Sequence, residues 1–402
     1  MSDSTPRPRP HVIPCPADFH LALRHRVHEA ITEILREEIA AALACDSYER
    51  TEDRLGWRNG VQSRQVTTEV GTVKLEVPRA RLSHPDGTTQ EFQSTVLPRY
   101  ARRTRRVDEA ILGCYLAGAN SRRIRKALEP LFGDTNLSRS AVSRIVARLK
   151  AIYAAWDQRD LSAEAYLVLI LDGLNLKVRL ARRVVSVPVL AVLGVAEDGT
   201  KHLVALRLFS SESSACWGEM VRELQRRGLP DPILVISDGA PGLLKALEHW
   251  PTTKLQRCTV HKLRNLLDHT PVHARAEVTR DYHRIVYAKD GLTARKVYDD
   301  FLAKWSKLCP AVARSLEEAG SHLLTFYEFP RSMWKALRTT NSLENLNREF
   351  RRRTKTQASF ASEDAAVTML YGLLAFGQIK LRKIDGHKVI HQIRKEGWTA
   401  AA

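Results

Sequence analysis

Cysteine is scarce in this sequence, and no two of its six cysteines form a Cys-x-x-Cys pair. Six scattered cysteines in 402 residues do not make a disulfide framework, which favours a reducing compartment. Long apolar runs are also missing, since none approaches the roughly 20 residues that cross a bilayer. The opening segment, MSDSTPRPRP, has no apolar stretch, so we expect no secretory signal. We therefore expect a cytoplasmic protein without a membrane partner.

Acidic residues are outnumbered in this chain. It has 45 Asp and Glu against 63 Lys and Arg, for a formal net charge of +18. A positive field of this size attracts phosphates, and binding gains free energy from released counterions. The composition therefore favours DNA or RNA as the partner. If the partner is DNA, we expect the protein to be associated with the nucleoid. A basic protein with no nucleic-acid role is the alternative.

The first hundred residues predict small structural units. With 402 residues and 44% hydrophobic content, the chain is long enough for several domains. Residues 1–16 are expected to be a disordered lead. Residues 17–98 predict a helix up to about residue 44, a polar loop, and a hairpin over 64–79 with its turn at Gly71.

Residues 99–160 predict a helix-turn-helix region that binds DNA. Ser121 and Ser138 can each cap a helix, and Pro130 with Gly133-Asp134 separates the two. The second helix opens with side chains that suit a major groove. An ordinary helical hairpin and a solvated basic linker are the alternatives. The DNA-binding candidates are Arg102, Arg103, Arg105, Arg106, Arg139, Ser140 and Arg144.

From residue 165 the periodicity changes to that of an α/β fold. Continuous apolar runs, beginning with Tyr166 to Leu171, predict buried strands, and helices are expected over about 212–227 and 242–250. The order β-β-β-α-β-α-β-α predicts a mixed sheet covered by helices, which is the order of the ribonuclease-H-like fold. We assign 161–265 to the first part of this core, 266–330 to an α-helical insertion and 331–402 to the second part. The second part is expected to end in an apolar helix from about Glu363 to Lys383.

Two carboxylates follow predicted core strands. Asp172 and Asp238 each stand at or near a strand end, so their side chains are expected to lie close together. Adjacent carboxylates repel each other unless a proton or cation lies between them, and oxygen ligands suit Mg²⁺ or Mn²⁺. The alternative is ordinary turn and cap chemistry, because Asp-Gly after a strand is a common turn.

A third carboxylate is expected from a later helix, with Glu328, Glu344 and Glu349 as candidates. Glu344 lies in a polar, basic run, and a cap interaction with Asn341 explains it equally well. Trp334 fits core packing or stacking on an unpaired base. Basic residues along the same helix are placed to follow a phosphate backbone: Arg348, Arg351, Arg352 and Lys355.

Cys258 and His261 are three positions apart, as in half of a zinc site. No second Cys/His pair has convincing spacing, so packing or a role beside the active site is favoured.

Several stretches together resemble one family, the bacterial mutator-type insertion-sequence transposases. The similar stretches are Arg58-Asn59-Gly60, Val77-Pro78-Arg79, Leu171-Asp172-Gly173, Ser237-Asp238-Gly239-Ala240, Gln256-Arg257-Cys258-Thr259-Val260-His261-Lys262 and Arg338-Thr339-Thr340-Asn341 to Arg353. The resemblance covers the chain from about residue 17. Ala80 departs from the pattern, since the family often has an acidic residue there.

The resemblance implies a DDE transposase whose triad is Asp172, Asp238 and Glu344. It further implies a ribonuclease-H-like catalytic domain interrupted by the helical insertion. The expected reaction is two-metal phosphoryl transfer with Mg²⁺ or Mn²⁺, first at the terminal inverted repeats and then at target DNA. Because an element has two ends, we expect a homodimer. A nuclease of the same fold and a non-catalytic DNA-binding derivative remain the alternatives.

Overall fold

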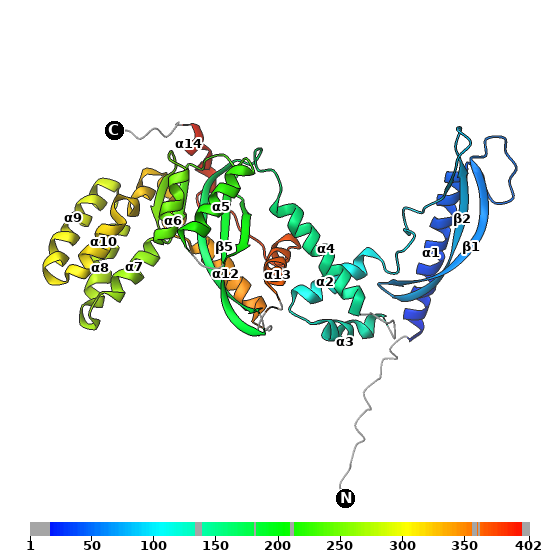
Figure 1. Ribbon diagram of the computed structural model, residues 1–402, viewed down its shortest axis with the longest axis horizontal. Helices are drawn as coiled ribbons and strands as arrows, with labels where there is room; N and C mark the ends of the chain where they lie inside the picture. Colours follow the sequence, from blue (N-terminus) through cyan, green and yellow to red (C-terminus); the bar gives the residue numbers. More distant parts are fainter. Residues whose placement is uncertain are drawn as a thin grey trace, which may run out of the picture. The chain divides into compact units, whose positions relative to one another are not determined.

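The computed structural model describes residues 17–132, 139–180, 182–209, 213–355, 360 and 362–395 (Figure 1). The chain divides into two compact units, Met1–Val146 and Ala147–Ala402. Each unit has hydrophobic clusters of its own. Among the described residues, no helix is both long and apolar enough to cross a membrane.

The first unit opens with a helix on an antiparallel sheet. Helix α1 (Ala17–Leu43) lies against strands β1 (Gly56–Thr68) and β2 (Gly71–Ser83), and β3 (Thr89–Glu91) pairs with β2. The predicted hairpin is confirmed but is longer than expected, because part of the expected loop belongs to β1. Gly71 has a φ of +114°, which glycine tolerates at the turn. Leu35 of α1 packs on Val66 and Leu75.

Three helices follow: α2 (Arg105–Leu116), α3 (Ser121–Phe132) and α4 (Arg139–Asp157). Ile124 and Leu128 form the buried apolar face of α3, and Val142 is buried on α4. The expected turn at Gly133-Asp134 and the expected cap, Ser138, lie outside the described residues. The boundary between the two units falls inside α4.

A five-stranded mixed sheet forms the centre of the second unit. Its order is β6-β5-β4-β7-β8, where β4 is antiparallel to β5 and parallel to β7. The chain order β-β-β-α-β-α-β-α is confirmed. The strands and the two intervening helices are β4 (Tyr166–Leu180), β5 (Arg183–Ala196), β6 (Lys201–Leu208), α5 (Ser214–Arg226), β7 (Leu234–Ser237), α6 (Pro241–Ala246) and β8 (Lys254–Arg257).

Strand β4 is central because it is apolar on both faces. Residues Val168 to Leu171 are fully buried, as a strand with neighbours on both sides and covered faces requires. Trp217 and Leu224 of α5 pack against Leu169 and Leu171. The packing of these residues holds β4 in place and so sets the position of Asp172, the next residue along the strand.

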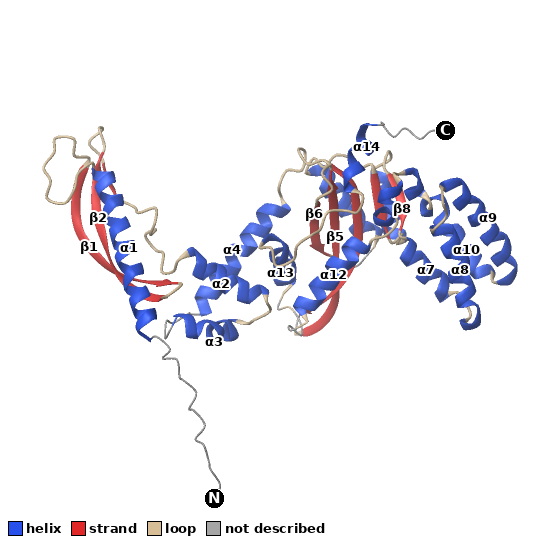
Figure 2. Ribbon diagram, turned by 180° about the vertical axis from the view of Figure 1, so that it is seen from behind, coloured by secondary structure: helices blue, strands red, loops and turns tan. Residues whose placement is uncertain are grey.

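Helices make up most of the chain after β8. Figure 1 shows α8–α10 as a bundle with its own core, which includes Phe301 and Trp305. Helix α12 packs on β4, and Figure 2 shows it in front of the sheet. The helices are α7 (Thr259–Asp268), α8 (Arg275–Val286), α9 (Gly291–Leu308), α10 (Pro310–Ala319), α11 (Trp334–Leu337), α12 (Asn341–Thr354), α13 (Glu363–Ala375) and α14 (Ile390–Lys395).

One predicted boundary was wrong. The last apolar helix was expected to run to about Lys383, but α13 ends at Ala375. The backbone N–H of Phe376 bonds to Gly372 and that of Gly377 to Leu374, and Gly377 takes a φ of +69°. This left-handed glycine terminates the helix despite the apolar residues that follow.

Candidate active site

Strands β4 and β7 bring Asp172 and Asp238 together. Leu171 pairs with Ser237 in parallel register, so Asp172 and Asp238 each follow one residue of this pair. Asp172 accepts a hydrogen bond from the backbone N–H of Gly173 (2.9 Å), and Asp238 accepts one from that of Ala240 (3.0 Å). Asp238 follows the last residue of β7 as expected, whereas Asp172 lies inside β4, opposite Ala191 of β5, and not at a strand end. The parallel pairing of β4 with β7 still places the two acids side by side.

The charged form of Asp172 is destabilised by its surroundings. Burial raises the pKa of Asp172 to about 7, and the charges of Asp238 and Glu344 act in the same direction, while His261 opposes them. Asp172 is only 8% exposed, so water screens this repulsion poorly. Such a group gains most from a cation placed beside it.

Helix α12 carries Glu344 and Asn347 on one face, three positions apart. The carboxamide Nδ2 of Asn347 donates to Asp172 Oδ2 over 3.3 Å. Asn347 Oδ1 is buried and has no hydrogen-bond partner among the described residues. Helix α12 begins at Asn341 with Thr340 as its N-cap, so the capping role considered for Asn341 and Glu344 is not seen.

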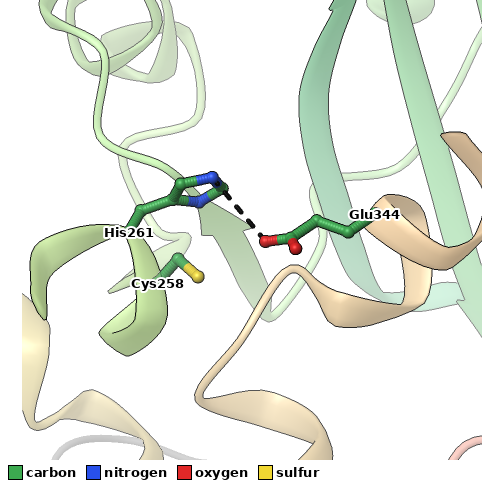
Figure 3. A group of neighbouring side chains, drawn as sticks. All are labelled: Cys258, His261 and Glu344. Atoms are coloured by element: carbon green, nitrogen blue, oxygen red, sulfur yellow. Dashed lines mark ion pairs between the residues drawn. The ribbon is translucent and has the colours of Figure 1, made fainter. Parts of the chain in front are cut away.

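Cys258, His261 and Glu344 form a cluster beside the acids, and Figure 3 shows His261 facing Glu344. Cys258 is the N-cap of α7, and His261 Nε2 lies 3.6 Å from Glu344 Oε1. The Thr340 hydroxyl joins the cluster, 3.4 Å from Cys258 Sγ, 3.4 Å from His261 Nδ1 and 3.3 Å from Glu344 Oε1.

The charges of this cluster are coupled. The hydrogen bond that His261 donates to the Cys258 sulfur raises the pKa of His261 to about 9, against the effect of burial. Burial acts to raise the pKa of Cys258, but hydrogen bonds from His261 and Thr340 outweigh it and hold that pKa below its usual value. The imidazolium form of His261 and the thiolate form of Cys258 therefore stabilise each other.

Asp172 and Glu344 line a cavity of about 320 Å³. Of the predicted basic residues, Arg348 and Arg351 line it, whereas Arg352 pairs with Glu349 (2.7 Å) and Lys355 is exposed outside the lining. Asp238 is not part of the lining. The lining residues are Asp172, Gly173, His261, Arg264, Glu344, Asn347, Arg348 and Arg351.

Three of the cluster and cavity residues were missed as candidates from the sequence: Thr340, Asn347 and Arg264. Arg264 Nη2 lies 3.9 Å from Glu344 Oε2. The positions of Asn347, one helical turn after Glu344, and of Arg264, one turn after His261, were the available signals.

An ion-pair network between two buried cations and the exposed carboxylate of Glu318 lies next to the turn that carries Asp238. Arg257, aligned with Ser237 in the sheet, pairs with Glu318 of α10 at 2.7 Å, and buried Lys262 reaches the same carboxylate at 2.6 Å. The Arg257 side chain lies against Gly239, where an added Cβ would stand 1.7 Å from Arg257 Nε. With a φ of +82°, this position next to Asp238 requires glycine.

Trp334 lies in an aromatic cluster. Its indole N–H donates to the Phe329 carbonyl over 2.6 Å, and its ring meets that of Tyr327 edge-on at 4.7 Å. The partly buried ring is not among the cavity-lining residues. The packing interpretation accounts for these contacts.

The predicted DNA-binding residues of the first unit differ in how they are held. Arg103 pairs with Asp108 (2.7 Å) and Arg105 with Glu109 (2.9 Å), while Arg102 and Arg106 are exposed. On α4, Ser140 and Arg144 are exposed, and Arg144 Nε donates to the Ser140 carbonyl over 3.3 Å. The side chain of Arg139 lies outside the described residues.

An α/β protein whose clustered carboxylates border an arginine-lined cavity is equipped to act on a phosphate backbone. The family described as Transposase, Mutator family, matches residues 18–378, and the chain belongs to it. It is therefore a transposase, an enzyme that cleaves DNA and transfers strands.

Curated relatives agree with this membership. The chain is 33% identical over 352 residues to the transposase for insertion sequence element ISRM5 of Rhizobium meliloti (strain 1021), covering 87% of this chain and 86% of the relative. It is 32% identical over 355 residues to that for IS905 of Lactococcus lactis subsp. lactis (strain IL1403), covering 87% of each. It is 31% identical over 349 residues to that for IS256 in transposon Tn4001 of Staphylococcus aureus, covering 85% and 86%.

Proposed function

We propose that this transposase cuts the ends of an insertion sequence and joins them to target DNA at a site made by Asp172, Asp238 and Glu344. The observation that carries the proposal is the convergence of the three acids. Two follow paired positions on parallel strands, and the third comes from α12 and contributes to the raised pKa of Asp172. The strand order, with β4 at the centre, supports a ribonuclease-H-like core.

The residues of this site fit divalent cations. The three acids offer only oxygen ligands, and His261 and the Gly173 backbone N–H offset the burial and repulsion at Asp172 only in part, because its pKa stays raised. Asn347 Oδ1, a buried acceptor without a partner among the described residues, adds a neutral oxygen beside Asp172. Asp172, Asp238 and Glu344 would hold two Mg²⁺ or Mn²⁺ ions, which activate water or a 3′-hydroxyl and stabilise the leaving oxygen.

The chain's own residues hold and orient the DNA. Arg264, Arg348 and Arg351 present guanidinium donors to the cavity. A guanidinium group can donate two parallel hydrogen bonds to the oxygens of one phosphate. The protonated His261 adds a positive charge next to Glu344. Asn347 holds the Asp172 carboxylate in place while the phosphate is bound.

The proposal has DNA at both stages. Terminal inverted repeats are cut first, and the freed end is then joined to target DNA in the nucleoid. The exposed basic residues of α2 and α4 bind the element's ends, with Arg106 and Arg144 as examples. Because both ends of one element are cut in one event, the proposal includes a homodimer.

Asp172→Ala tests the site. We expect loss of cleavage of a labelled element end with Mg²⁺, by about 1000-fold or more. Binding of the same DNA in a gel-shift assay should stay unchanged, because the carboxylate does not attract phosphates. Asp198→Ala is the matched control, since Asp198 lies in an exposed turn and pairs with Lys383. Cleavage that persists in Asp172→Ala would overturn the assignment.

A second reaction in the same assay tests strand transfer. Wild-type protein, a pre-cut element end and a target plasmid should give joined molecules. Cleaved ends without joined products would identify a nuclease instead. DNA binding without any divalent-dependent cleavage would identify a non-catalytic DNA-binding protein.

A further inference from the structure

We propose that Cys258, His261 and Glu344 form a binding site for Zn²⁺, and that zinc bound there inhibits the transposase by withdrawing Glu344 from the acidic site. The inhibition rests on the proposed role of Glu344, whereas the metal site itself does not. The two parts therefore have separate tests.

The geometry of the three ligands fits a small tetrahedral ion. One ligand atom from each residue lies within 4.8 Å of the other two, and His261 Nε2 and Glu344 Oε1 are 3.6 Å apart. Zinc bonds of about 2.0–2.3 Å place tetrahedral ligand atoms about 3.3–3.8 Å from one another. Figure 3 shows the three side chains converging from two segments of the chain, so modest rotations bring all three onto one ion.

A fourth polar group completes the surroundings. The Thr340 hydroxyl oxygen is 3.3 Å from Glu344 Oε1 and 3.4 Å from Cys258 Sγ. It lies 3.4 Å from a ring nitrogen of His261 as well. This oxygen therefore lies within about 3.4 Å of all three side chains, on the Nδ1 side of the imidazole, and either it or a water molecule can supply the fourth ligand of a zinc ion.

The chemistry of the ligands selects zinc over magnesium. Thiolate and imidazole favour Zn²⁺, whereas Mg²⁺ prefers oxygen ligands such as those of Asp172 and Asp238. Cys258 lies at the N-terminus of α7, where the helix dipole stabilises a thiolate. Two sites with different preferences thus share a single carboxylate, that of Glu344.

A cation has a path to this site. Cys258 is fully buried, but His261 and Glu344 both line the cavity that opens beside the acids. An ion entering there meets the imidazole and the carboxylate first and the sulfur behind them. Once Glu344 binds zinc, its oxygens are no longer available to the ions held by Asp172 and Asp238, so the two occupations compete.

Cobalt is the probe for the metal site, because Co²⁺ replaces Zn²⁺ and absorbs in the near ultraviolet when a thiolate binds it. Titration of the full-length, metal-free, reduced protein should give this band with one Co²⁺ per chain, and Zn²⁺ should remove it. Cys258→Ser should abolish the band, and His261→Asn should weaken Co²⁺ binding at least tenfold. Cys309→Ser and Asp172→Ala should keep the band, since neither residue belongs to the cluster.

Inhibition is measured separately, as Zn²⁺ titration of DNA-end cleavage in excess Mg²⁺, with each variant's rate divided by its own zinc-free rate. The cleavage rate of the wild type should fall at least tenfold, and Cys258→Ser should need at least tenfold more Zn²⁺ for the same fall.

Absence of the cobalt band, or its survival in folded Cys258→Ser, overturns the metal site. If Cys258→Ser does not fold, unchanged Co²⁺ affinity in His261→Asn overturns it instead. Equal zinc sensitivity of wild type and variant overturns the inhibition, and the cobalt result stands even if the protein cleaves no DNA.

Discussion

Asn347 and Asp172 join the helix that carries Glu344 to the central strand of the sheet. The Asn347 carboxamide donates to Asp172 Oδ2 over 3.3 Å, and both residues are buried. Because the bond comes one turn after Glu344, it sets the position of α12 relative to β4. It also supports a carboxylate whose charge is opposed by burial and by its neighbours.

Asn347→Ala should therefore raise the divalent-ion requirement. Loss of one hydrogen bond to a charged group costs about 1.5–3 kcal/mol, which corresponds to roughly a tenfold or greater fall in cleavage rate at limiting Mg²⁺. The measurement is the cleavage rate across a Mg²⁺ titration. Asn345→Ala is the control, since Asn345 is an exposed residue of the same helix. Identical Mg²⁺ curves for wild type and Asn347→Ala would show that the bond has no such role.

Glu344→Gln tests the member of the triad that a helix cap explained equally well from sequence. The change keeps size and helix propensity but removes the charge, so cleavage should fall by about 100-fold or more while DNA-end binding stays. The control is Glu349→Gln on the same helix, where the carboxylate pairs with Arg352. A Glu344→Gln protein that cleaves at the control's rate would remove Glu344 from the site.

The pH dependence of stability should report on Asp172. Burial, reinforced by Asp238, raises the pKa of Asp172 from 3.8 to about 7. Because the folded-state pKa lies above the unfolded one, its contribution to the stability of the metal-free protein is full below about pH 4. It is lost as the pH rises through about 7, by on the order of 4 kcal/mol.

Asp172→Asn should remove that loss. In EDTA, the free energy of unfolding of this variant relative to wild type should increase between pH 4 and pH 8, as measured by urea unfolding. Asp299→Asn, at an exposed position on α9, should show a constant difference from wild type. A constant difference for Asp172→Asn as well would mean that folding does not raise the pKa of Asp172.

Arg144→Ala addresses DNA binding by the first unit and α4. The exposed guanidinium should contact the DNA end, so its loss should weaken binding by about 5-fold or more, from about 1–3 kcal/mol per specific contact. The measurement is fluorescence anisotropy with a labelled end and with an unrelated duplex. Arg36→Ala is the control, because it removes the same charge from an exposed residue of α1. Equal affinity of Arg144→Ala and wild type for the end would exclude base contact by this residue.

The sequence by itself predicted the chain order of the strands and the pair Asp172 and Asp238, although it placed Asp172 at a strand end and β4 continues to Leu180. Buried strands need continuous apolar runs. The strands at Tyr166 to Leu171 and before Ser237 can therefore be predicted without knowing which strands they pair with. Once a parallel pairing is assumed, Asp172 and Asp238 must end side by side. Helix ends were less visible, because a glycine such as Gly377 stops a helix through backbone geometry rather than apolar periodicity.

Tertiary structure alone decided which later side chains reach those acids. Local periodicity shows that α12 has an apolar face, but only its packing on β4 brings Glu344 and Asn347 to Asp172. The same packing gathers Cys258 and His261 around Glu344, a cluster that the Cys-x-x-His spacing did not reveal because its third ligand lies far along the chain. Contacts of this kind depend on how separate elements pack around a common core, and no local pattern in the chain encodes that arrangement.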